Sequence, residues 1–92
     1  MPAPIPVQNF VFTEHALSEI SRRGISEDQV AAVLAKPEQS DLVRADRTVY
    51  QSKLSFGEPP REFILRVFVD TDRNPPQVVT VYRTSKIEKY WR

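Results

Sequence analysis

The hydrophobic pattern of this 92-residue chain changes its period once, and that change limits the folds open to it. Up to Pro37, apolar residues recur at the three- and four-residue spacing of helices. From Asp41 onward they alternate with polar residues, as in strands that bury one face. Helices followed by a run of strands are typical of the α+β class. The length leaves room for a single domain of this kind.

Two short helices are predicted ahead of the sheet. The first covers Glu14–Arg23, with Thr13 suited to cap its N-terminus and Gly24 its C-terminus. The second follows a capping box at Ser26–Gln29 and ends before Pro37. The apolar positions predicted to face the core are Ala16, Leu17, Ile20, Val30, Val33 and Leu34.

The second part of the chain predicts four strands joined by short turns, which favours an antiparallel meander. A last helical turn is predicted from Lys86 to Arg92, with Ser85 as its cap. We therefore expect two N-terminal helices packed on one face of a four-stranded antiparallel sheet. The predicted strands are Asp41–Ala45, Thr48–Phe56, Glu62–Asp70 and Val78–Thr84.

Strict alternation also predicts which side chains share a face of the sheet. It places Val79 and Val81 with Arg83 on the aliphatic face under the helices, where Arg83 lies near the strand end. The opposite face is mixed in character, as in a binding surface or any partly solvated antiparallel sheet. Among the residues of that face are Arg66, Phe68, Thr80 and Tyr82.

Residues 1–10 are predicted to form an extended proline-rich arm, and residues 11–92 the single domain. The arm has neither the basic nor the apolar region of a secretory signal. No apolar run reaches the roughly 18–20 residues that span a bilayer. We therefore expect a cytoplasmic protein without membrane contact.

Composition excludes several chemistries. The chain has one histidine, no cysteine and two glycines, so neither a zinc site nor a glycine-rich phosphate loop is expected, and no cofactor is predicted. The net charge of +1 hides an uneven distribution. Residues 1–60 carry 6 basic and 8 acidic side chains, and residues 61–92 carry 7 basic and 4 acidic. The basic C-terminal third suits either phosphate binding or a solvated tail.

Four segments in this order resemble a known family: His15-Ala16, Arg23–Ser26, Val79–Lys86 and Lys89–Trp91. They are similar to the family filed as domain of unknown function 4258, and the resemblance covers roughly residues 12–92. That family is considered similar in fold to RelE, BrnT and related small bacterial ribonuclease toxins. The resemblance implies a metal-independent endoribonuclease, RNA as its substrate and a cognate antitoxin as a possible partner.

A metal-free ribonuclease needs a proton-transferring side chain and cations for the phosphate. His15 is the side chain whose ordinary pKa lies nearest neutrality. The expected catalytic residues are His15, Arg23, Arg66 and Arg83, and the expected substrate-binding residues are Thr80, Tyr82 and Lys86.

Several of these residues also have a structural explanation. His15 can hydrogen-bond to a carboxylate or a backbone carbonyl. Arg23 can cap the carbonyls of its helix or pair with Glu19 or Glu27, and Arg66 can belong to a cross-strand ion pair. Tyr82 can serve packing alone, and Lys86 can belong to a solvated tail. The alternative function is accordingly a non-catalytic RNA- or protein-binding module.

Overall fold

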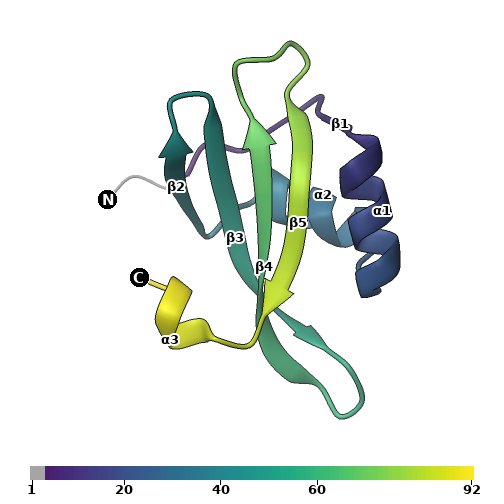
Figure 1. The fold of residues 1–92 in the computed structure, drawn as a ribbon. Helices are drawn as coiled ribbons and strands as arrows, with labels where there is room; N and C mark the ends of the chain where they lie inside the picture. Colours follow the sequence, from purple (N-terminus) through teal and green to yellow (C-terminus); the bar gives the residue numbers. More distant parts are fainter. Residues whose placement is uncertain (1–3) are drawn as a thin grey trace.

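The computed structural model describes residues 4–92 as an α+β domain (Figure 1). Residues 1–3 of the predicted arm lie outside the described residues. In chain order the elements are β1 (Val11–Phe12), α1 (Glu14–Arg23), α2 (Glu27–Ala35), β2 (Gln39–Arg44), β3 (Arg47–Phe56), β4 (Arg61–Asp70), β5 (Gln77–Thr84) and α3 (Ile87–Tyr90).

The helix caps follow the sequence closely. Thr13 Oγ1 accepts from Ala16 N at 3.1 Å, and Gly24 ends α1 with φ 68°, a conformation that glycine adopts without strain. The capping box of Ser26 and Gln29 is present at the start of α2. The prediction for the last turn is wrong in one respect. The residue ahead of α3 is Lys86, and no side chain caps that helix.

The sheet has five strands in the order β1-β5-β4-β3-β2. The antiparallel meander of β2 to β5 is confirmed, but the prediction of a purely antiparallel four-stranded sheet is wrong. β1 pairs parallel to β5, with Val11 opposite Gln77 and Phe12 opposite Val78. A two-residue strand is too short to produce a recognisable alternation, so the sequence pattern did not indicate it.

The β4–β5 pairing contains a bulge that changes the predicted faces. Phe68 lies opposite Thr80, whereas Val69 lies opposite Val78, so Val79 is the extra residue. Val78 and Val81 are both fully buried in the core, and Val79 is not. The prediction that Val79 and Val81 share the buried face is therefore wrong at Val79.

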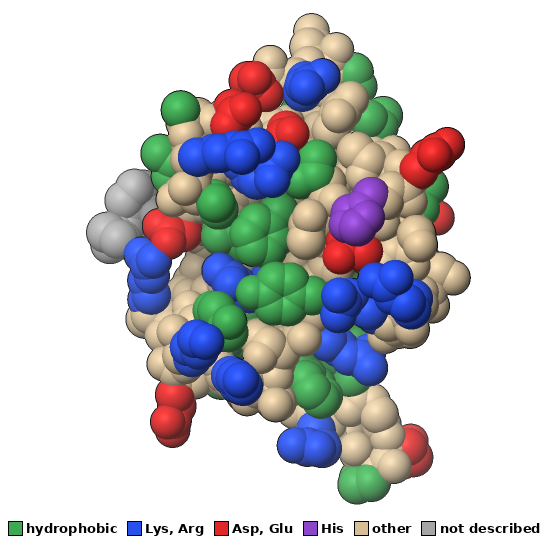
Figure 2. All heavy atoms as spheres, in the orientation of Figure 1, with side chains coloured by type: hydrophobic (Ala, Val, Ile, Leu, Met, Phe, Trp, Pro, Cys, Tyr) green, Lys and Arg blue, Asp and Glu red, His purple; other side chains and the backbone are tan. Residues whose placement is uncertain are grey.

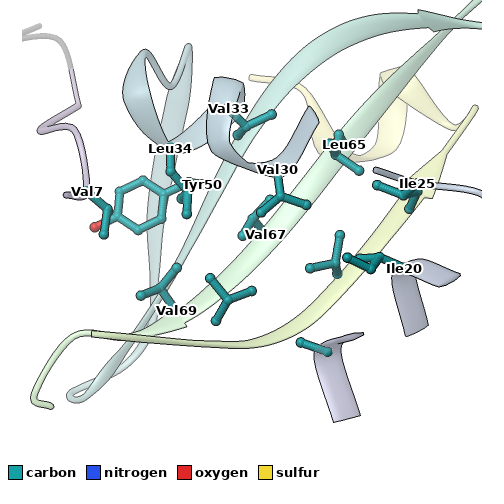
Figure 3. Packing of buried hydrophobic residues seen from close by; sticks show 13 residues of the cluster. Val7, Ile20, Ile25, Val30, Val33, Leu34, Tyr50, Leu65, Val67 and Val69 are labelled. Atoms are coloured by element: carbon teal, nitrogen blue, oxygen red, sulfur yellow. The ribbon is translucent and has the colours of Figure 1, made fainter. Parts of the chain in front are cut away.

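The helices cover one face of the sheet, here called the helix side (Figure 1). In Figure 3, Val30 and Val33 of α2 lie against Leu65 and Val67 of β4, while Ile20 of α1 completes the core beside β5. Burial of this apolar surface is the main stabilising contribution to the fold.

Two details differ from the predicted core of α1. Leu17 is 39% exposed, although it was predicted to face the core, whereas the charged Glu19 is buried. The arm also contributes, because Val7 is buried and its N–H donates to Leu34 O at 2.9 Å. The arm thus lies across α2 from Pro4 onward. No helix within residues 4–92 is long and apolar enough to cross a membrane.

Candidate functional site at the edge of the sheet

Three ionisable residues on α1 form a line beside β5. His15, Glu19 and Arg23 are four residues apart and therefore lie on one side of the helix. Glu19 is the buried member: its Oε1 accepts from Val81 N at 3.1 Å. Its other oxygen, Oε2, lies 3.5 Å from His15 Nε2 and 3.8 Å from Arg23 Nη2. One buried carboxylate thus holds both predicted catalytic side chains against the edge of the sheet.

His15 and Arg23 stay accessible in this arrangement. Their side chains are 69% and 42% exposed, so each can contact a ligand in solution without a change of backbone. In Figure 2 the purple histidine lies beside a red carboxylate group, with Lys and Arg side chains in blue below it.

The face of the sheet opposite the helices, here called the open face, adjoins this line. Val81 stands between Thr80 and Tyr82 in β5, so the Glu19 carboxylate meets the strand at their level. Both side chains project from the open face, where Tyr82 is stacked with Phe68 at 5.9 Å between ring centroids. The predicted substrate-binding residues Thr80 and Tyr82 thus lie beside His15 and Arg23.

Arg66 occupies the next strand of the open face, and two of its five N–H groups are engaged within the protein. Nε donates to Gln51 Oε1 at 3.0 Å, and Nη1 donates to Tyr82 Oη at 2.6 Å. The guanidinium also lies 4.4 Å from the ring centroid of Tyr90, a cation–π contact. Arg66 therefore fixes the Tyr82 hydroxyl rather than presenting a free fork to solvent.

The segment from α3 to the C-terminus covers part of the open face. Gln51 Nε2 donates to Tyr90 O at 3.0 Å, and Gln39 Nε2 donates to Arg92 O at 2.7 Å. Lys53 Nζ lies 4.4 Å from the centroid of the Trp91 ring. These contacts join the segment to β2 and β3. Tyr90 of the same segment also contacts Arg66 in β4 and Tyr82 in β5, so the segment extends over the open face as far as β5.

Two predicted site residues lie away from this centre. Arg83 pairs with Leu65, a core residue, and so projects to the helix side at the end of β5, as alternation predicted. Lys86 is exposed in the link to α3, where its N–H donates to Thr84 Oγ1 at 3.1 Å. The predicted set of four catalytic residues is therefore not assembled in one place, because Arg83 and Arg66 belong to opposite faces.

Sequence reasoning missed the central role of Glu19. The signal was present: a histidine, an acid and an arginine at successive four-residue intervals are neighbours on a helix. Spacing alone offers Glu19 and Glu27 equally as partners of Arg23. Its contact with the sheet depends on how α1 packs along β5, which local spacing does not reveal. Within residues 4–92, no group of three His, Asp or Glu residues is arranged to hold a metal ion.

Comparison with known proteins places the chain in a family and gives no closer relative. Neither the curated proteins nor the solved structures contain a match to this chain. A family model described as a domain of unknown function (DUF4258) matches residues 12–83. The matched range runs from β1 to the end of β5, and so contains both the α1 line and the open face. The chain belongs to the DUF4258 family.

Proposed function

We propose that this protein is a metal-independent endoribonuclease of the RelE/BrnT-like toxin kind, acting in the cytoplasm. The observation that carries the proposal is the pairing of exposed His15 and Arg23 with one buried carboxylate, beside an aromatic sheet face. A cognate antitoxin covering this surface would be the partner of such an enzyme.

The chemistry required is a transfer within the RNA itself. His15 takes the proton from a ribose 2′-hydroxyl, and the 2′-oxygen attacks the adjacent phosphorus. The bond from phosphorus to the 5′-oxygen breaks, leaving a 2′,3′-cyclic phosphate and a 5′-hydroxyl. Arg23 stabilises the charge that develops on the phosphoryl oxygens. Glu19 Oε2, 3.5 Å from His15 Nε2, would hold the imidazole in position for this transfer.

Tyr82 is suited to protonate the leaving 5′-oxygen. Its hydroxyl accepts from Arg66 Nη1 at 2.6 Å, and a hydrogen bond from Tyr82 lowers the pKa of Tyr90, so a leaving 5′-oxygen would take the Tyr82 proton in place of Tyr90. The stacked rings of Tyr82 and Phe68 provide a flat surface for a base, the usual means of holding single-stranded RNA. Thr80, on the same strand, would contact the sugar or phosphate.

A second candidate is a binding module without catalysis. Two observations favour it: Arg66 already donates two of its N–H groups within the protein, and Arg83 lies on the other face. An RNA-binding surface needs the aromatic face and the cations but not a converging set of catalytic groups. The two functions differ in whether His15 transfers a proton.

The deciding experiment is incubation of the purified protein with labelled RNA in the presence of EDTA. We expect cleavage to cyclic-phosphate and 5′-hydroxyl ends, lowered about a hundredfold or more by His15→Ala. Arg23→Ala should lower the rate about tenfold, whereas Arg22→Ala is the matched control. Arg22 is exposed, belongs to the same helix turn and forms no ion pair within residues 4–92.

The result can reject the proposal in two ways. Cleavage that His15→Ala leaves unchanged would mean a different mechanism or a contaminating nuclease. RNA binding without cleavage by the unaltered protein would establish the binding module instead.

A further inference from the structure

A second arginine–aromatic cluster lies on the helix side, where the β3–β4 hairpin extends beyond the helices (Figure 1). Phe56 and Phe63 meet edge to face at 5.7 Å between centroids. The Arg83 guanidinium lies 4.6 Å from the Phe56 centroid, and that of Arg61 lies 5.8 Å from the Phe63 centroid. Together with Gly24 and the hairpin turn they line a cavity of about 390 Å³, here called the hairpin pocket.

The two arginines of the hairpin pocket have no partner for their charge. Within residues 4–92, neither Arg61 nor Arg83 forms an ion pair, and neither side chain donates a hydrogen bond. Stacking on a ring uses the flat face of a guanidinium and leaves its in-plane N–H groups free. Those N–H groups fit a phosphate, which accepts two of them at once.

The pocket also has the surface and size for a nucleotide. The half-exposed rings and guanidinium planes are of the kind on which unpaired bases stack. A volume of about 390 Å³ falls at the small end of ligand sites, which run from about 300 to 1,000 Å³. One acidic residue of the hairpin turn, Glu58, also lines the pocket, and its negative charge would repel a bound anion.

The pocket lies near the C-terminal end of α1. Gly24 lines it and directly follows Arg23, and Arg83 directly follows Tyr82 in β5. Arg83 faces the helix side, whereas Tyr82 faces the open face. An RNA strand that occupies both sites would therefore have to pass around the edge of β5 beside α1.

We propose that the hairpin pocket is a second subsite for single-stranded RNA, in which Arg61 and Arg83 hold a phosphate and the aromatic cluster stacks a base flanking the cleaved bond. The inference rests on the proposed function in taking RNA as the ligand. It predicts that an RNA long enough to reach the pocket binds more tightly than one that fills only the α1 edge. It also predicts a preference for unpaired RNA, because bases in a duplex are not free to stack.

The test measures the dissociation constants of fluorescein-labelled oligouridylates of two and eight nucleotides, and of an RNA duplex of eight base pairs. The full chain carrying His15→Ala keeps the RNA intact. We expect the octamer to bind at least about tenfold more tightly than the dinucleotide, since one stacked base contributes about 1–3 kcal/mol. Arg83→Ala should remove this gain and leave dinucleotide binding unchanged.

Two further variants keep the test decisive if Arg83→Ala folds poorly. Arg83→Lys retains the charge without the planar fork and should lose about threefold in octamer affinity. Phe63→Leu should weaken the binding of the octamer and leave the binding of the dinucleotide unchanged. Arg73→Ala is the matched control, an exposed arginine in the turn at the far end of the same two strands.

The outcomes separate this inference from the proposed function. Equal octamer binding in Arg83→Ala and Arg73→Ala would overturn the pocket, even if the unaltered protein cleaves RNA. If Arg83→Ala weakened the binding of octamer and duplex equally, the pocket would also be overturned. Such a result is expected where Arg83 attracts RNA by its charge alone. A selective loss of octamer binding in a protein that never cleaves RNA would support the pocket and reject the enzyme.

Discussion

Arg66 and Arg83 lie on the same pair of strands and both contact aromatic rings, yet they differ in what surrounds their N–H groups. Arg66 donates to Gln51 and Tyr82 and contacts the Tyr90 ring. Arg83 contacts Phe56 and Phe63 and donates to nothing within residues 4–92. A buried or half-buried arginine is expected to have partners. The difference indicates that Arg66 holds the sheet face together, whereas Arg83 has capacity for a ligand.

The contrast follows from position in the sheet. Arg66 is central in β4, opposite Gln51 on one side and Tyr82 on the other, so polar side chains reach it from both neighbouring strands. Arg83 is the penultimate residue of β5 and faces the hairpin extension, where its neighbours are apolar rings. The same residue type is therefore structural in one place and available in the other.

The largest expected effect comes from replacing Arg66 with methionine. The same replacement at Arg83 gives the comparison. Arg66→Met leaves Gln51 Oε1 without its donor and removes the bond to Tyr82, so the free energy of unfolding should fall by about 2–3 kcal/mol. Arg83→Met keeps an apolar side chain beside the Phe56 and Phe63 rings and loses the cation–π attraction, so it should lower the free energy of unfolding by only about 0.5–1 kcal/mol. Urea denaturation of both variants gives the comparison. Equal losses would show that Arg83 is structural too.

Asp70→Asn tests a second polar interaction on the open face, the pair of Asp70 and Arg47. Asp70 accepts from Arg47 Nε at 2.6 Å, and this hydrogen bond, together with the positive charge, holds the pKa of Asp70 below its ordinary value. The pair therefore stabilises the fold above the ordinary pKa of about 3.9, and this contribution is lost as the pH falls through the lower folded-state pKa.

We expect Asp70→Asn to lower the free energy of unfolding by about 2 kcal/mol at pH 7. The difference from the unaltered protein should shrink steadily below pH 4. Thermal or urea unfolding followed across this pH range measures both quantities. A difference that stays constant down to pH 2 would mean that the side-chain shape of Asp70, and not its charge, is what matters.

The two regions also show how far sequence reasoning reaches. Strand alternation placed Arg66, Thr80 and Tyr82 together and put Arg83 near the strand end on the helix side, as the structure has them. It failed at Val79, because a bulge depends on pairing with the neighbouring strand, and one extra residue inverts the faces beyond it.

Long-range contacts explain the remaining differences. β1 is held by its pairing with β5, and Glu19 by the N–H of Val81, which is 62 residues away in the chain. A carboxylate on a helix is usually predicted to face solvent, because its burial is favourable only where a hydrogen-bond donor lies within reach of it. The sequence reveals the residue types of the candidate site, and the fold decides which of them meet.

Removal of the Tyr90 ring should have a smaller effect than either change at the centre of the open face. Tyr90→Ala loses the contact with Arg66 at 4.4 Å and the edge-to-face contact with Tyr82 at 6.5 Å. We expect a loss of about 1 kcal/mol in the free energy of unfolding. The adjacent exposed Lys89→Ala is the control and should change little. A loss above about 2 kcal/mol would show that α3 contributes to the stability of the fold as a core element does, and does not simply lie on the open face.

The smallest expected effect concerns charge at the hairpin pocket. Glu58 is the one carboxylate among the lining residues, so Glu58→Gln removes a repulsion without disturbing the two arginines. The octamer should bind about twofold more tightly, because exposed charges contribute only about 0.2–1 kcal/mol, and the gain should shrink at high salt. The same change should leave the dinucleotide unaffected, since that ligand does not reach the pocket. A gain for both RNAs would instead indicate a general electrostatic field over the protein surface, and the distinction between a partnered Arg66 and an available Arg83 would lose its support.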